Sequence, residues 1–172
     1  MTEEKRLGSD GYDVSYFITV CTLDRKTTLG KADDGTVFVN EYGVLAHNLI
    51  KKLENLLRGV RIDNRAVMPN HVHFIMSVRS LDGQGYMPDS LTLPFTAVSV
   101  FKDVTGSVFA DIAKGAPSEP PRWQKGYSVH RIRDEAEYSA IYKYVTLNPS
   151  LWTDDIHNPE NPRFTTWKET GR

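Results

Sequence analysis

Two histidines separated by a single residue, His71 and His73, are the side chains of this chain best placed for chemistry. They lie in the stretch Pro-Asn-His-Val-His-Phe-Ile-Met at 69–76, whose alternation predicts a β-strand. Side chains of a strand point alternately to opposite faces, so the two imidazoles would share one face while Val72 and Phe74 meet an apolar core. Paired imidazoles are a natural start to a metal site, although such a pair on a half-buried strand can also be purely structural.

Tyr144 and Asn148 form a second candidate pair near the end of a predicted helix. The helix would begin at Asp134 as N-cap, with Glu137 three residues later, and Pro149 would end it near Asn148. Residues four apart are neighbours on one helix face, so a phenol and a carboxamide would stand together, as a nucleophile and a metal ligand. The alternative is that Tyr144 is a core tyrosine and Asn148 a C-terminal cap.

Other tyrosines and histidines match these roles less well. Tyr138 belongs to the apolar stripe of the same predicted helix, and Tyr142 would face away from Tyr144, so both are expected in the core. The remaining histidines lack a paired strand position and are expected to be weaker metal candidates: His47, His130 and His157.

Residues 122–133 carry basic and aromatic side chains with no acid between them. Cations suit phosphates and flat rings suit unpaired bases, so this segment predicts contact with a single nucleic-acid strand. In the alternative, it is a solvated loop whose Trp123 anchors the core. Acids gather at 33–34 and 154–155 and are expected to face away from nucleic acid. The predicted DNA-binding residues, with one lysine from an earlier helix, are Lys102, Arg122, Trp123, Gln124, Lys125, Tyr127, Arg131 and Arg133.

Short motifs in a fixed order run through most of the chain, from roughly residue 12 to residue 167. Together they resemble the REP-associated tyrosine transposases, relatives of the single-strand insertion-sequence transposases within the HUH endonucleases. Their order and spacing are more specific than any one motif. The matching segments are 16–22, 40–43, 67–73, 100–102, 123–124 with Tyr127, 132–135, and 144–149 with Trp152.

The resemblance implies a metal-dependent, single-strand-specific DNA endonuclease and strand transferase acting on hairpin-forming repeated palindromes. Tyr144 would form a 5′-phosphotyrosine, with His71, His73 and Asn148 holding Mg²⁺ or Mn²⁺. The expected partner is single-stranded or hairpin DNA, bound by a monomer or homodimer in the bacterial cytoplasm, at the nucleoid. The alternatives are a non-catalytic nucleic-acid-binding module on the same fold and a structural domain with incidental histidines.

Composition fits a soluble globular protein of one domain: 172 residues, 40% hydrophobic and 25% charged. No apolar run is long enough for a bilayer, and the charged N-terminus does not read as a signal peptide. Cys21 is the only cysteine, which excludes an internal disulfide and fits a reducing compartment. The net charge of −1 argues mildly against nucleic-acid binding, but the distribution of charge matters more.

The order of predicted elements indicates an α+β fold, a ferredoxin-like (RRM-like) antiparallel sheet with helices packed on one face. A loose polar tail is expected over 1–12 and a single transposase-like catalytic domain over 13–172. This fold hosts many unrelated functions, so it does not decide the activity. The expected strands are 14–23, 36–39, 61–68, 71–78 and 127–132; the helices are 40–58, 94–113 and 134–148; the loops are 81–91 and 114–121.

Overall fold

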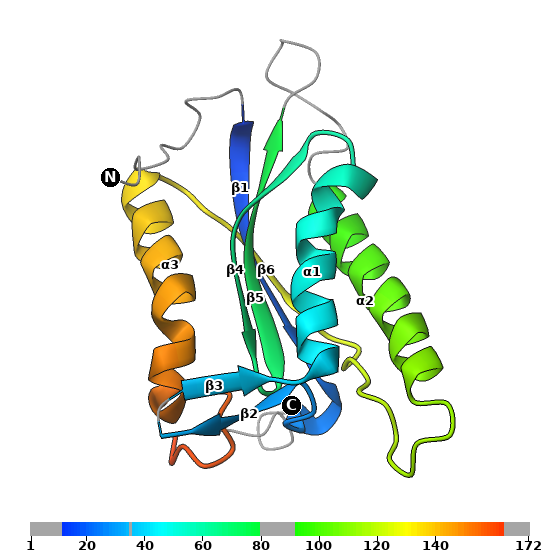
Figure 1. Ribbon diagram of the computed structural model, residues 1–172. Helices are drawn as coiled ribbons and strands as arrows, with labels where there is room; N and C mark the ends of the chain where they lie inside the picture. Colours follow the sequence, from blue (N-terminus) through cyan, green and yellow to red (C-terminus); the bar gives the residue numbers. More distant parts are fainter. Residues whose placement is uncertain (1–11, 35, 80–91, 164–172) are drawn as a thin grey trace, which may run out of the picture.

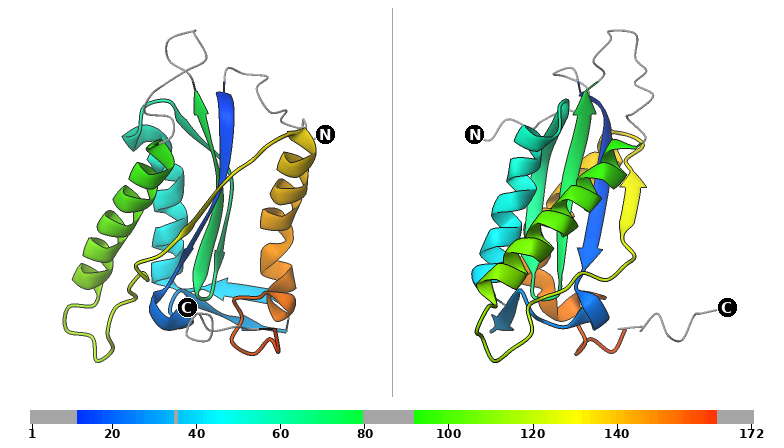
Figure 2. Two further views of the ribbon diagram at one scale, coloured as in Figure 1. Left: turned by 180° about the vertical axis from the view of Figure 1, so that it is seen from behind. Right: turned by 90° about the vertical axis from the view of Figure 1, so that its right-hand side faces the viewer.

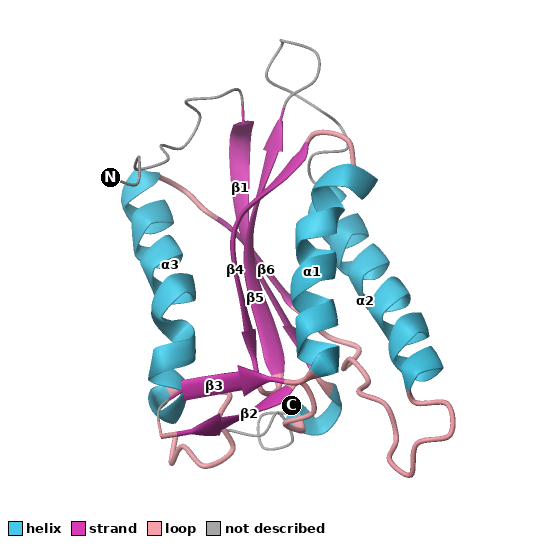
Figure 3. Ribbon diagram, in the orientation of Figure 1, coloured by secondary structure: helices cyan, strands magenta, loops and turns pink. Residues whose placement is uncertain are grey.

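The computed structural model describes residues 12–34, 36–79 and 92–163. Its centre is an antiparallel sheet with the strand order β4-β5-β1-β6 (Figure 1). With helices packed on this sheet, the predicted α+β ferredoxin-like class is confirmed (Figure 3). The strands of the sheet are β1 (Tyr12–Cys21), β4 (Val60–Met68), β5 (His71–Arg79) and β6 (Ser128–Arg131).

The helices divide between the two faces of the sheet. Helices α1 (Glu41–Leu56) and α2 (Leu93–Ile112) share one face, as expected, and bury the main core against it. Helix α3 (Glu135–Leu147) lies alone against the opposite face, where a smaller core forms around Ile75 and Val145 (Figures 1 and 2). The sheet is therefore a middle layer, and each of its faces has a different role.

Strand β5 shows how the sequence produces these two faces. Val72, Phe74 and Met76 are fully buried in the α1–α2 core. The alternate positions, with His71 and His73, point toward the α3 side, as the two-residue period requires. The predicted placement of the two imidazoles on one face is thus confirmed.

Capping residues set the helix ends where the sequence predicts them. Asn40 accepts a hydrogen bond from the Gly43 amide at 3.1 Å, and Asp134 accepts one from the Glu137 amide at 2.9 Å. Gly59 follows α1 with φ 77°, a left-handed conformation that glycine adopts without a side-chain penalty. Helices α1 and α3 therefore begin at N-cap residues that can be recognised in the sequence.

Several features differ from the predicted elements. Strand β2 (Gly30–Asp33), which pairs with β3 (Thr36–Val39), was not predicted, and neither was the 3₁₀ turn at Asn148–Asp154. The expected loop at 81–91 and residues 1–11 of the expected tail lie outside the described residues. Among the helices that the structure does describe, none combines the length and apolar character needed to cross a bilayer.

Candidate metal centre and active site

The two histidines of β5 bring their ring nitrogens together beneath α3. His71 and His73 are 0% and 2% exposed, and their Nε2 atoms lie 3.0 Å apart. That distance is about the spacing of neighbouring ligands around an octahedral ion with bonds of about 2.1 Å. Burial lowers the pKa of His71 well below its usual range and that of His73 to about 3, so both rings are neutral at pH 7.

Asn70 determines which nitrogen of His71 is available. Its Nδ2 donates to the carbonyls of Arg25 at 3.0 Å and His157 at 2.8 Å, which fixes the orientation of the carboxamide. Its Oδ1 then lies 2.8 Å from Nδ1 of His71 and can only accept, so Nδ1 carries the proton and Nε2 a lone pair. Nδ1 of His73 lies 2.8 Å from the Thr19 hydroxyl. Where that hydroxyl accepts the Nδ1 proton, Nε2 of His73 keeps its lone pair for a cation.

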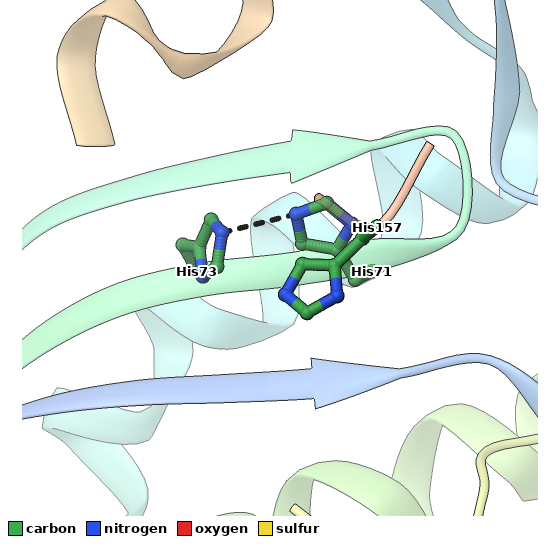
Figure 4. Close-up of side chains that lie close together, drawn as sticks. All are labelled: His71, His73 and His157. Atoms are coloured by element: carbon green, nitrogen blue, oxygen red, sulfur yellow. Dashed lines mark hydrogen bonds between the residues drawn. The ribbon is translucent and has the colours of Figure 1, made fainter. Parts of the chain in front are cut away.

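His157 joins the cluster, so the prediction that it is a weaker metal candidate was wrong. Ring nitrogens of His71, His73 and His157 all lie within 4.8 Å of one another, a group that could hold a metal ion (Figure 4). His157 arrives after the 3₁₀ turn, where its amide donates to Asp155 Oδ1 at 2.6 Å. No periodic pattern surrounds it, so the only signal in the sequence was its presence in a polar turn-rich segment.

Tyr144 projects from α3 toward the same cluster. Its hydroxyl lies 3.4 Å from Nε2 of His73, and its ring packs edge-on against Phe17. The side chain is 39% exposed, which does not fit the core-tyrosine alternative. Burial of the hydroxyl, followed by the Asp155 carboxylate, raises the pKa of Tyr144 to about 12, while the side chain of Asn148 opposes the shift.

Asn148 and Asp155 supply buried oxygens that lack partners. Asn148 is 2% exposed, and its Oδ1 has no hydrogen-bond partner among the described residues; the same holds for Oδ2 of Asp155. That Asp155 oxygen lies 3.7 Å from Nε2 of His71. Asp155 therefore lies beside the histidine cluster. The prediction that the acids at 154–155 face away from nucleic acid stays a prediction. Unpaired acceptors near imidazole lone pairs fit a cation, because one cation can accept lone pairs from several of them at once.

The other tyrosines of α3 divide as follows. Tyr138 is buried in the smaller core, as predicted. Tyr142 is 39% exposed, so its predicted place in the core was wrong. No hydrogen bond joins Tyr142 to the histidine cluster in the described part of the chain, whereas Tyr144 has such a contact.

Within the predicted DNA-binding set, Lys102, Trp123 and Tyr127 form a packed unit. Nζ of Lys102 donates to the carbonyls of Gln124 at 2.8 Å and Lys125 at 3.0 Å, and lies 4.8 Å from the centre of the Tyr127 ring. Trp123 packs on the main core and donates from its indole to Thr105 at 2.7 Å, which favours the core-anchor alternative for this residue. Lys102 thus fixes the loop that precedes β6.

The exposed cations of the segment 122–133 are partly paired. The run has no acid in sequence, but folding brings Glu119 to Arg122 at 3.4 Å and Glu137 to Arg133 at 3.0 Å. Lys125 and Arg131 are exposed. A role for these cations in binding DNA stays a prediction.

A groove connects this loop with the histidine cluster. Its volume is about 950 Å³, and it runs between the loop before β6 and the segment around His157. Its lining includes Thr19, Arg25, Gln124, Tyr127, Ile156 and His157. Two of these residues are in or next to the cluster, because Thr19 contacts His73. The groove therefore reaches the edge of the cluster at His157 and Thr19.

No family model matches the chain, but it is similar to individual proteins. An uncharacterized protein of Haemophilus influenzae is 28% identical over 155 residues, which cover 86% of this chain and 84% of that protein. A REP-associated tyrosine transposase, solved bound to a REP hairpin, is 20% identical with a TM-score of 0.48, over 87% of this chain and 73% of its own. A Deinococcus radiodurans R1 protein, provisionally described as a transposase, is 18% identical with a TM-score of 0.47, over 83% and 95%.

Proposed function

We propose that this protein is a metal-dependent, single-strand-specific DNA endonuclease and strand transferase, a transposase, that acts through Tyr144. One observation carries the proposal: the Tyr144 hydroxyl lies 3.4 Å from a histidine nitrogen in a cluster of unpaired acceptors. A nucleophile beside a cation site is what phosphodiester cleavage requires. The motif resemblance to REP-associated tyrosine transposases points to hairpin-forming DNA as the substrate.

In the proposed reaction, the Tyr144 oxygen attacks phosphorus, and the bond from phosphorus to the 3′ oxygen breaks. The phenol loses its proton, the departing 3′ oxygen gains one, and the 5′ end stays joined to the protein as phosphotyrosine. The energy of the phosphodiester is kept in that bond, so a 3′-hydroxyl can reverse the step without ATP. The raised pKa of Tyr144 means that the phenol needs a nearby positive charge to ionise.

His71, His73 and Asn148 would hold the divalent ion, Mg²⁺ or Mn²⁺, and Asp155 could complete the set. His157 could do so only where its Nδ1 does not accept from Arg25. When bound, such an ion polarises a phosphoryl oxygen and stabilises charge on the phosphate. Asn70 and Thr19 would orient the two rings from behind. Phe17 would limit the directions in which the Tyr144 ring can point.

The test is incubation of the full chain with end-labelled hairpin DNA and Mn²⁺, followed by denaturing electrophoresis. We expect a covalent protein–DNA adduct, and mass spectrometry of the digested adduct should place the phosphate on Tyr144. A phosphate on another residue would contradict the assignment of the nucleophile. Hairpin binding without any adduct, in Mg²⁺ and in Mn²⁺, would favour the non-catalytic binding module.

A further inference from the structure

We infer that Arg25 forms an anion subsite beside the histidine cluster and that its ligand is a phosphodiester group of the DNA strand. The inference rests on the proposed function, and it adds a residue that lies outside the histidine and tyrosine motifs. Arg25 follows β1, in the 3₁₀ turn Leu23–Arg25, far in sequence from both motifs.

The guanidinium of Arg25 is half-buried and has no acidic partner. Among the described residues, its side chain has one hydrogen-bond partner, Nδ1 of His157. A guanidinium has five N–H donors, so most of its hydrogen-bonding capacity is unused here. A partly desolvated cation with no carboxylate in direct contact among the described residues favours an anion, and the planar fork of arginine matches two oxygens of a phosphate.

The backbone holds Arg25 in a conformation that a side-chain-bearing residue adopts rarely. Asp24 and Arg25 both have φ 55°, in the left-handed region. The Arg25 amide donates to the Thr22 carbonyl at 3.1 Å, and its carbonyl accepts from Asn70 at 3.0 Å. Because the same Asn70 side chain also contacts His71, the guanidinium and the metal-binding ring are positioned by one residue.

The contact between Arg25 and His157 can give way to a ligand. The guanidinium only donates, so Nδ1 of His157 is the acceptor, and the neutral ring carries its proton on Nε2. Both residues line the groove of about 950 Å³, together with Tyr127 and Gln124. A phosphate oxygen of a strand in this groove would take the place of Nδ1 as acceptor, with a stronger, charge-assisted hydrogen bond.

Electrostatics agree with a role for Arg25 across the whole site. Its positive charge lowers the pKa of His157 after the larger effect of burial, and that of His71 after burial and the neighbouring His73 and His157. Burial raises the pKa of Asp155, and Arg25 opposes that shift after two hydrogen bonds. A bound phosphate would therefore meet Arg25 on one side and the cation of the histidine cluster on the other. Two positive groups flanking one phosphate are a common way to stabilise the charge that builds up at phosphorus.

The first test measures phosphate binding without DNA and without metal. Phenyl phosphate, which carries the aryl phosphate of phosphotyrosine, is titrated into the protein while the histidine ring signals are followed by NMR. Arg25→Gln should weaken binding by about tenfold, whereas Arg25→Lys should retain part of it. The neighbouring Lys26→Gln, exposed in the same loop, is the matched control and should stay within about twofold of wild type. Equal affinity of wild type and Arg25→Gln would overturn the inference.

The second test separates this inference from the proposed function. Co²⁺ absorption and circular dichroism should be unchanged in Arg25→Gln, while the rate of adduct formation on hairpin DNA should fall by on the order of a hundredfold. If the adduct forms at the wild-type rate in Arg25→Gln, the inference is wrong although the proposed function stands. If wild type forms no adduct but Arg25→Gln has lost affinity for phenyl phosphate, the anion subsite stands and the nuclease assignment fails.

Discussion

Two ends of one sheet face treat their buried polar groups in opposite ways. At one end, Ser15 and Ser77 are hydrogen-bonded at 2.5 Å, Ser77 also bonds Asp63, and Asp63 pairs with Arg61. At the other end, beneath the last turns of α3, Nε2 of His71 faces Nε2 of His73, and two carbonyl or carboxylate oxygens have no partner. The first end is a closed polar network.

The difference distinguishes buried polar groups that stabilise the fold from those arranged to bind a ligand. A buried donor–acceptor chain that satisfies itself specifies a structure. A buried cluster composed of acceptors has no such internal solution, and adding a cation supplies it. Both ends lie on one face of β5, where Ser77 and His73 are 1% and 2% exposed, so the contrast comes from residue type and not from a difference in burial.

Removing the nucleophile should have the largest effect. Tyr144→Phe deletes one hydroxyl and should reduce adduct formation by about a thousandfold or more, with no change in hairpin affinity. The matched control is Tyr142→Phe, on the same helix with the same exposure, which should cleave normally. Single-turnover assays on labelled hairpin DNA measure both variants. If the Tyr144→Phe protein still forms phosphotyrosine, another tyrosine is the nucleophile.

Removing one ligand of the cluster should abolish stabilisation by metal. A site filled at 100 times its Kd adds about 2.7 kcal/mol to the free energy of unfolding of wild type. His73→Ala should lower Mn²⁺ affinity by on the order of a hundredfold, so that Mn²⁺ no longer raises its Tm. Thermal melts with Mn²⁺ and with EDTA check this, and His47→Ala on α1 is the control. A full Mn²⁺ response in His73→Ala would mean that the cation binds somewhere else.

The closed polar network around Ser77 should show the opposite pattern, with stability lowered and metal affinity unchanged. Ser77→Ala removes a buried donor to Asp63 and should lower the free energy of unfolding by about 1–3 kcal/mol. Its Mn²⁺ affinity should equal that of wild type. Urea unfolding and a Mn²⁺ titration measure the two quantities. Loss of metal binding in Ser77→Ala would show that the two ends act as a single unit.

The smallest expected effect concerns the exposed cations near the groove. Replacing Lys125 and Arg131 with alanine should weaken binding of all hairpins by similar factors. Each lost phosphate contact should reduce the slope of log K against log salt by about 0.7. Binding titrations at several salt concentrations give the slope, and Lys114→Ala, in the turn just after α2, is the control. An unchanged slope would indicate that the loop before β6 is only structural.

Much of the fold follows from local sequence patterns. The alternation in β5 and the N-caps at Asn40 and Asp134 placed the histidine face and two helix starts correctly, because these features depend on nearest neighbours. Strand β2 could not be predicted in this way. This strand has only four residues, of which two are charged, and it depends on pairing with β3.

The candidate site was predictable only in the parts that lie on regular elements. Strand β5 carries His71 and His73, and helix α3 carries Tyr144. The repeat of each element predicts to which of its faces these side chains point. Asp155 and His157 reach the cluster through irregular backbone, which the Asn70 side chain holds at the His157 carbonyl, a contact between residues far apart in the sequence. The exposure of Tyr142 likewise depends on how α3 lies across the sheet, which its own period does not determine.

The position of α3 late in the chain has a consequence for protein synthesis. The ribosome releases β1, β4, β5 and both helices of the main core before Tyr144, Asn148 and Asp155 emerge. A nascent or prematurely terminated chain can thus assemble the histidine face while it lacks the nucleophile. On the proposed function, a chain released before Tyr144 is made lacks the nucleophile and would not nick DNA.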